Sequence, residues 1–381
     1  MIGRKYFSKV LNLSASLVSS VGEPLVMRRP ALKQHARERG QLFHFGSSVT
    51  HSFGPPQHPK EVLDSLQRRY GEYHTPKPFV AEVRDVTLLG PYPIPFKRAS
   101  ALVEPVVSER TLLLNLFYSV VDPRREHRSM MSRDFDCACL LFNSQSRGVF
   151  HWMVEDALRA EGVFRYEEKT GRRPTLIIPP NPKSWQIETL ELLGFESEDW
   201  VEWDAFSGKV DRLVVPSVRR TYDDGVVAPA QTEWFSKKMV AGAEDNVEGS
   251  ETFSRVYISR DDAGRRRVTN EEDLMDELGD LGFERYYLER MSTAEIVNLF
   301  NNAETIVAPH GAGLTNIMFA DNADVIELLP NDSYSWAYYV LSEQHGFDYC
   351  YVMGDDDEEK TDFRVDPAEV IDVLSGSVDG V

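Results

Sequence analysis

The strongest chemical signal in the sequence is a glycine-bearing turn between a predicted strand and a predicted helix. An apolar run ends at Pro309, and the residues that follow are His-Gly-Ala-Gly-Leu-Thr-Asn. Glycine lets a backbone approach a ligand closely, and the first N–H groups of a helix carry a partial positive charge. The turn is therefore suited to a pyrophosphate, although such turns can also be purely structural. The candidate binding residues are His310, Gly311, Ala312, Gly313, Leu314 and Thr315.

A second signal is a cluster of arginines that follows a predicted strand. Four arginines lie within residues 260–267, in a chain whose net charge is −19. Guanidinium groups hold phosphate oxygens in pairs of hydrogen bonds and can neutralise a leaving nucleotide. The alternative is a surface patch that pairs with nearby carboxylates. We favour phosphate binding for Arg260 and include Arg265 as a candidate.

A third cluster lies at the beginning of a predicted helix in the first half of the chain. Helical spacing places His151 and Glu155 on one face, with Asp156 beside them. A carboxylate or an imidazole there could remove a proton from an acceptor hydroxyl. The alternative is an aromatic-rich helix that packs on a sheet, with both carboxylates in solvent.

Apolar runs and amphipathic segments alternate from residue 110 onwards, and these elements must position the three clusters. We expect strands at 137–142, 175–178 and 213–215, with helices at 150–160 and 183–193. In the second half, strands at 255–259, 284–288, 305–308 and 325–328 alternate with helices at 270–279, 292–302 and 314–319. Ser292 is the expected N-cap of one helix, and the charge run at 354–360 is an expected loop.

This alternation predicts an α/β fold with parallel sheets. We expect residues 1–105 to be an extension of short strands and loops packed on the first domain. We expect two Rossmann-like domains, the first at 106–228 and the second at 229–381, where it ends in a helix.

The three clusters together resemble glycosyltransferase family 61. Members carry a His-Trp-x-x-x-Asp stretch, which matches 151–156 here, and a Ser-Arg-x-x-Ala…Arg-x-Val-x-Asn-Glu stretch, which matches 259–271. They also carry Pro-His-Gly-Ala-Gly-Leu-Thr-Asn followed by an Ile-Glu-Leu strand, which matches 309–316 and 326–328. The resemblance runs from about residue 140 to 352. Gly148-Val149-Phe150 departs from the asparagine and aromatic that usually precede the His-Trp pair.

The resemblance implies a GT-B architecture, in which two Rossmann-like domains face a cleft. It implies that the domain at 106–228 lies on the acceptor side and that the domain at 229–381 binds the nucleotide sugar. It implies an inverting glycosyltransferase that moves a sugar from a nucleotide-sugar donor to a hydroxyl acceptor in surface polysaccharide or glycoconjugate synthesis. Asp156 matches the position of the base, with His151 and Glu155 as second choices. Arg260 and the 310–315 loop would stabilise the departing diphosphate without a metal, and the donor would be the only co-substrate required. Glu327 would accept hydrogen bonds from the ribose or hold a neighbouring loop.

Composition limits the partners. The chain of 381 residues has 61 acidic and 42 basic residues, only 12 of them lysines, which favours a salt-adapted surface over an ordinary acidic one. The resulting negative field opposes nucleic-acid binding. Residues 1–23 lack the apolar core of a signal peptide, and no apolar stretch approaches a membrane span, so we expect a cytoplasmic protein. The three cysteines are expected to be core thiols.

Other interpretations stay open. The acceptor is a saccharide or a lipid-linked glycan, and a peripheral association with the membrane face is compatible with the latter. Asp134-Phe135-Asp136 has the form of the metal-binding pair of metal-dependent transferases, although it precedes a predicted strand. A third interpretation is a non-catalytic nucleotide- or polysaccharide-binding subunit with the same fold.

Overall fold

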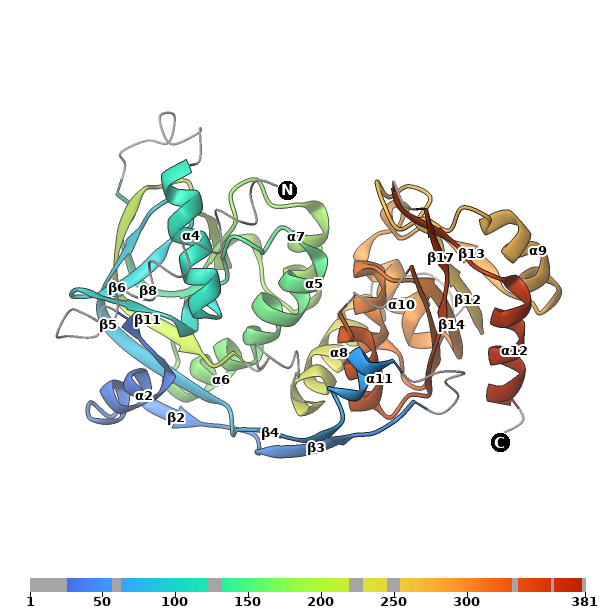
Figure 1. The fold of residues 1–381 in the computed structure, drawn as a ribbon. Coiled ribbons are helices and arrows are strands. Elements are labelled where there is room, and N and C mark those ends of the chain that lie inside the picture. The colour runs from blue at the N-terminus through green and yellow to red at the C-terminus, as the bar shows by residue number, and fades with distance from the viewer. Residues whose placement is uncertain are drawn as a thin grey trace. The chain divides into compact units, whose positions relative to one another are not determined.

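The computed structural model describes residues 26–56, 63–121, 132–218, 229–244, 254–330, 335–357 and 360–378 (Figure 1). Contacts between Cα atoms divide the chain into two compact units. The first comprises residues 1–46, 77–183 and 196–218, and the second comprises 47–76, 184–195 and 219–381. Both units are discontinuous in sequence, because the segments 47–76 and 184–195 pack with the carboxyl-terminal part of the chain.

A nine-stranded mixed sheet forms the centre of the first unit. Its strands are β1 (Val26–Met27), β2 (Leu42–His44), β5 (Phe79–Leu89), β6 (Ile94–Lys97), β7 (Ser100–Leu102), β8 (Phe135–Leu140), β9 (Thr175–Ile178), β10 (Trp200–Glu202) and β11 (Ser207–Pro216). The main order is β1-β7-β6-β5-β11-β8-β9-β10, and β2 pairs with β5. Strands β11, β8, β9 and β10 run parallel, whereas β5, β6 and β7 are joined antiparallel.

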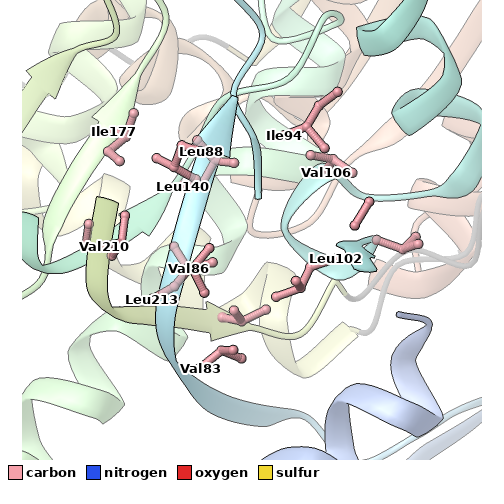
Figure 2. Packing of buried hydrophobic residues seen from close by; sticks show 14 of the residues in the cluster. Val83, Val86, Leu88, Ile94, Leu102, Val106, Leu140, Ile177, Val210 and Leu213 are labelled. Atoms are coloured by element: carbon pink, nitrogen blue, oxygen red, sulfur yellow. The ribbon is translucent and has the colours of Figure 1, made fainter. Parts of the chain in front are cut away.

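The core of this unit lies along its longest strands. Val83, Val86 and Leu88 of β5 gather with Val210 and Leu213 of β11 in one buried cluster (Figure 2). The alternation of buried and exposed positions along β5 and β11 follows from the period of two in a strand. The surrounding helices are α2 (Arg29–Arg37), η1 (Glu104–Val106), α4 (Glu109–Val121), α5 (Val149–His151), α6 (Ala160–Thr170) and η5 (Ser197–Asp199).

A five-stranded parallel sheet forms the centre of the second unit. Its strands are β12 (Arg255–Ile258), β13 (Glu284–Tyr286), β14 (Thr305–Pro309), β15 (Asp324–Leu329) and β16 (Tyr349–Met353). The helices are α3 (Asp64–Gln67), α7 (Ser184–Leu192), α8 (Pro229–Glu244), α9 (Glu271–Asp280), η6 (Leu288–Arg290), α10 (Thr293–Asn302), η7 (Ala312–Phe319), α11 (Ala337–His345) and α12 (Pro367–Val378). Helices α9 and α12 contact each other on one side, and α8, α10 and η7 contact one another on the other (Figure 1).

The strand order of the second unit is β13-β12-β14-β15-β16. In chain order this is 2-1-3-4-5, one of the two common orders of doubly wound α/β folds. The connections therefore reverse direction between β12 and β14, which are neighbours in the sheet. In doubly wound folds, ligands bind outside the carboxyl ends of the two strands at which the strand order reverses.

The expected α/β class and the second-half strands are confirmed, and so is the N-cap. Ser292 Oγ accepts the Glu295 N–H, and the Glu295 carboxylate accepts the Ser292 N–H, which together form a capping box. The helical stretch expected at 150–160 is confirmed, and it consists of α5, a π-helical turn η3 (Trp152–Asp156), a 3₁₀ turn η4 (Ala157–Arg159) and the first residue of α6.

The loop expected at 354–360 is wrong. Here β17 (Asp355–Asp357) and β18 (Lys360–Arg364) pair as antiparallel strands. A further antiparallel pair in this unit, β3 (Val49–Phe53) with β4 (Gly71–Thr75), comes from the amino-terminal part of the chain. The Tyr339 hydroxyl on α11 donates to the Gly54 carbonyl that follows β3, which ties this pair to the unit.

Two further observations bear on the sequence predictions. Cys137, Cys139 and Cys350 are free and buried, as expected for core thiols. Among the described helices, none combines the length and the apolar composition that crossing a membrane would require.

Candidate functional site

The carboxyl ends of β12 and β14 bring together two of the sequence-predicted clusters. Strand β12 ends at Ile258 and is followed by Ser259 and Arg260, while β14 ends at Pro309 and is followed by His310. The two strands are hydrogen-bonded in parallel, so both segments leave the sheet at the same edge. Residues about fifty positions apart in sequence therefore meet at one place.

The Arg260 guanidinium lies very close to the backbone of Gly311 at this edge of the sheet. A Cβ atom added at Gly311 would lie well under 3.0 Å from Arg260 Nη1, a separation that real Cβ atoms essentially never show. The φ of Gly311 is 178°, which is extended backbone, so a larger residue here would displace the Arg260 side chain without straining the backbone dihedral. The guanidinium thus lies against the backbone immediately before η7, and the first N–H groups of a helix have no partner within the helix.

Arg260 is a half-buried cation that forms no ion pair with a carboxylate among the described residues. Its Nη2 donates to the Arg265 carbonyl at 3.3 Å, and its Nε has no hydrogen-bond partner among the described residues. Burial and, next, the positive charge of Arg266 lower the pKa of Arg260. Two guanidinium groups held close together in a strongly acidic protein indicate a site for an anion.

The other arginines of the 260–267 cluster have separate positions. Arg265 is exposed and contributes its carbonyl to Arg260. Arg267 donates to Asp362 at 2.7 Å and forms an ion pair within the unit. Arg266 has a left-handed φ of +59° and is half-buried near Arg260, but the sequence pattern did not distinguish it from its neighbours.

A buried hydrogen-bonded chain supports the residue after β14. His310 Nδ1 contacts Glu327 Oε1, and the Tyr349 hydroxyl donates to Glu327 Oε2 at 2.6 Å. His310 directly follows β14, Glu327 is inside β15, and Tyr349 is the first residue of β16. These three strands are consecutive in the sheet. The exposed fraction is 6% for His310 and 0% for Glu327. Both Glu327 oxygens are thus engaged inside the protein.

Other residues of the 310–315 loop and its surroundings are packed near His310. The ring of Tyr338 lies 5.3 Å from the ring of His310. Thr315 is fully buried, and Gly313 packs against Leu288, which would lie 3.0 Å from a Cβ at that position. Tyr338 and Tyr349 were not predicted, because their elements lie beyond the motif and carry no local signal for it.

The first unit holds the third predicted cluster in the π-helical turn. His151 Nδ1 lies 3.0 Å from Glu155 Oε2, and the exposed fraction of the side chain is 32% for His151 and 0% for Glu155. A buried carboxylate thus lies against one nitrogen of a partly exposed imidazole. π-Helical turns of this kind are frequent at functional sites.

Asp156 occupies a different environment from its two neighbours. Its carboxylate accepts hydrogen bonds from Ser146 Oγ at 2.6 Å, Arg159 Nη2 at 2.7 Å and Asn143 Nδ2 at 3.2 Å. Both Asp156 and Arg159 are almost completely buried. Burial raises the pKa of Asp156, while the charge of Arg159 opposes that shift. The structure therefore surrounds Asp156 with internal partners.

One known protein family matches the part of the chain that holds these residues. Residues 149–326 match the family model described as Glycosyltransferase 61. This match supports the assignment of the segment to glycosyltransferase family 61. The match confirms the resemblance seen in the sequence, and it indicates glycosyltransferase activity with a sugar donor and an acceptor. No curated protein matched the chain.

The family 61 segment contains all three clusters. It begins just before His151, includes Arg260 and the 310–315 loop, and ends at Ile326, one residue before Glu327. The histidine-supporting residues Glu327 and Tyr349 therefore lie outside the matched segment.

Asp134 and Asp136 each have a hydrogen-bond or ion-pair partner nearby. Asp134 accepts hydrogen bonds from Ser132 Oγ and from the Lys209 N–H, and Asp136 pairs with Arg212 at 2.6 Å. Within the described ranges, no group of three or more His, Cys, Asp or Glu side chains is arranged to hold a metal ion.

Proposed function

We propose that the protein is a nucleotide-sugar-dependent, inverting glycosyltransferase whose donor diphosphate binds at the carboxyl ends of β12 and β14 in the second unit. The match to the family model supports the transferase activity. The observation that carries the site is the Arg260 guanidinium against Gly311 at the point where the strand order reverses. The acceptor class we propose is a saccharide or lipid-linked glycan of surface polysaccharide or glycoconjugate synthesis.

The charge distribution favours a diphosphate over a neutral ligand. Arg260 and Arg266 place two positive charges beside the beginning of η7, whereas the chain as a whole carries −19. Guanidinium groups recognise phosphate oxygens bidentately, and backbone N–H groups at a helix beginning add further donors. Arg265 is exposed at the rim, where it adds a long-range positive charge.

The same groups would assist bond cleavage. As the bond between the anomeric carbon and the diphosphate oxygen breaks, negative charge builds on the departing diphosphate. Preorganised cations and N–H donors stabilise that charge and thereby lower the barrier. The diphosphate leaves from one face of the sugar, so an inverting transfer requires the acceptor oxygen to attack the opposite face.

For deprotonation of the acceptor we propose His151, with Glu155 orienting it. The acceptor hydroxyl proton would pass to the imidazole nitrogen that faces away from Glu155 while the new glycosidic bond forms. A partly exposed histidine against a buried carboxylate follows the common pattern of an oriented general base. Asp156, with three hydrogen-bond partners and no exposure, would hold the π-helical turn in shape. The expected GT-B arrangement of the two units belongs to this proposal.

Calorimetric titration with UDP, GDP, ADP and CDP tests the donor site. We expect at least one to bind, and we expect Arg260→Ala to weaken it about 10–100-fold, the value of one or two hydrogen bonds to a charged group. Arg364→Ala is the matched control, because Arg364 is an exposed arginine of the same unit that pairs with Asp273 at 3.4 Å. If no nucleoside diphosphate binds, the proposal is wrong. Binding without any transfer or donor hydrolysis would favour a non-catalytic binding subunit.

A further inference from the structure

The two ends of the segment 259–271 are joined by a hydrogen bond that has no role in the mechanism given so far. Ser259 directly follows β12, and Glu271 is the first residue of α9. The Ser259 hydroxyl donates to Glu271 Oε2 at 3.0 Å, and both residues are buried. The residues between them therefore form a loop that is closed at its base, and Arg260 is the first residue of that loop.

The Ser259 hydroxyl makes a second hydrogen bond, which fixes the path of the chain around Arg260. Its oxygen accepts the Asp261 N–H at 3.2 Å, the local contact by which a serine hydroxyl stabilises a turn. A hydroxyl group has one proton to donate. Because that proton is donated to Glu271, a lone pair of the oxygen is left for the Asp261 N–H. The backbone of Arg260 is thus held between two residues that are tied to each other.

Glu271 and Ser259 are in turn held by the sheet. Glu271 Oε1 accepts the Tyr257 hydroxyl of β12 at 2.9 Å, and Arg285 of β13 lies 3.7 Å from Glu271 Oε2. The Ser259 N–H donates to the Tyr286 carbonyl, also of β13, at 2.9 Å. The base of the loop is therefore attached to two neighbouring strands, which provide a rigid support for a binding residue on a loop.

The side chain of Arg260 has little other support. Within the described ranges its guanidinium makes one hydrogen bond, at 3.3 Å, and the acceptor is the carbonyl of Arg265 in the same loop. Gly311 leaves space for the guanidinium and donates no hydrogen bond to it. The direction of the Arg260 side chain therefore depends on the position of its own backbone, which the Ser259–Glu271 contact determines.

Building on the proposed function, we propose that Ser259 and Glu271 are positioning residues that place the Arg260 guanidinium for the donor diphosphate. Neither side chain contacts the diphosphate. Glu271 orients the Ser259 hydroxyl, the hydroxyl fixes the turn at 259–261, and the turn directs Arg260 toward Gly311. The affinity for a nucleoside diphosphate then depends on the Ser259–Glu271 hydrogen bond only through Arg260.

Two substitutions break this connection from its two ends. Ser259→Ala removes both hydrogen bonds of the hydroxyl, and Glu271→Met removes the acceptor at a similar side-chain length. Each should weaken binding of a nucleoside diphosphate about 3–30-fold, a part of the loss expected for Arg260→Ala. In the Arg260→Ala background each should change the affinity by less than about 2-fold, since changes that act through one residue are not additive. A merely structural role would lower the melting temperature without this dependence on Arg260.

Ser217→Ala is the matched control. Ser217 directly follows β11, its exposed fraction is 3%, and its hydroxyl oxygen accepts the Phe79 N–H at 3.1 Å. It therefore resembles Ser259 in burial and in its contact with a backbone N–H, but it belongs to the first unit. Ser217→Ala should lower the melting temperature about as much as Ser259→Ala and leave nucleotide affinity unchanged.

The experiment is calorimetric titration of the full chain with the tightest-binding of UDP, GDP, ADP and CDP, for each single variant and for its combination with Arg260→Ala. Melting temperatures are measured on the same samples. The expected result is a loss of affinity for Ser259→Ala and Glu271→Met that disappears in the Arg260→Ala background, with no loss for Ser217→Ala.

Three results would count against the inference or its basis. Unchanged affinity in Ser259→Ala, or an equal loss in the Arg260→Ala background, would overturn the inference while leaving the diphosphate site intact. If the wild type binds none of the four nucleotides, the proposed function itself fails. If Glu271→Met does not fold, as judged by its melting temperature, the comparison of Ser259→Ala with and without Arg260→Ala still decides the question.

Discussion

The guanidinium of Arg260 occupies the space where a side chain at position 311 would begin. This relationship joins two segments that the motif analysis placed separately, one after β12 and one after β14. Gly311 leaves the space in which the Arg260 guanidinium lies. The arginine is thereby placed at the point where a doubly wound sheet binds its ligand.

Gly311→Ala should displace Arg260 and weaken binding of a nucleoside diphosphate about 10–100-fold. Because φ at this position is extended, the added methyl group strains no backbone dihedral. In the double variant with Arg260→Ala, the second substitution should cost little more, since the two changes act on the same contact. The measurement is calorimetry on the two single variants and the double variant. Fully additive losses would show that the residues act independently.

Gly279→Ala is the control for that prediction. Gly279 lies in helix α9, and nothing stands within 4 Å of the position that its Cβ would take. Alanine there should stabilise the chain by up to about 1 kcal/mol through helix propensity, with nucleotide affinity unchanged. A loss of affinity in this variant would mean that the Gly311 result reports general damage.

Substitutions in the π-helical turn should separate catalysis from stability. His151→Ala should lower the transfer rate about 10²–10⁴-fold, the usual contribution of a general base, with little change in melting temperature. Arg159→Ala should lower the free energy of unfolding by about 3–5 kcal/mol, because it leaves the buried Asp156 charge without its ion-pair partner. The measurements are steady-state transfer and chemical denaturation. Full activity in His151→Ala would remove this residue as the base.

Arg267 should contribute to stability and not to donor binding. Burial tends to raise the pKa of Asp362, but hydrogen bonds from Arg267 outweigh it and leave that pKa lowered. A carboxylate with a lowered folded-state pKa stabilises the native state above its unfolded pKa of about 3.9, and this stability is lost as the pH falls through the folded value. Arg267→Ala should therefore be less stable than the wild type at pH 7, with the gap closing below about pH 4.

That prediction is checked by denaturant unfolding of both proteins between pH 7 and pH 3. The nucleotide affinity of Arg267→Ala is the control, and it should match that of the wild type apart from a small long-range term. A pH-independent difference in stability would show that the Asp362 ion pair is not its cause.

The three cysteines provide a test of the packing. All are buried, and burial raises the pKa of Cys139 to about 12. Because the thiolate is the reactive form, the native protein should react only slowly with a thiol reagent at pH 8. All three should react at once after unfolding in denaturant. Rapid reaction of one thiol in the native state would place that cysteine at the surface.

Much of the second unit could be predicted from the sequence because its signals are local. Apolar runs mark β12, β14 and β15, and Ser292 with Glu295 marks the beginning of α10. The meeting of Arg260 with the 310–315 loop followed from a general property of parallel sheets, in which successive strand ends lie at one edge.

The features that the sequence did not reveal depend on contacts between distant segments. Nothing local distinguishes the π-helical turn at 152–156 from an α-helical one, because the difference is one residue of register. The left-handed backbone at Arg266 is set by the loop around it. Tyr349 reaches Glu327 only because β16 pairs with β15. Similarly, α7 is recognisable in the sequence only as a helical stretch, and its contacts with α8 and α10 assign it to the second unit.

A crystal structure of the protein with a bound nucleoside diphosphate would test the central claim most directly. The account predicts that the diphosphate lies at the carboxyl ends of β12 and β14, with its oxygens contacting the Arg260 guanidinium and the backbone N–H groups at the beginning of η7. A diphosphate bound elsewhere in the second unit, with Arg260 still against Gly311 and no phosphate near it, would contradict the account.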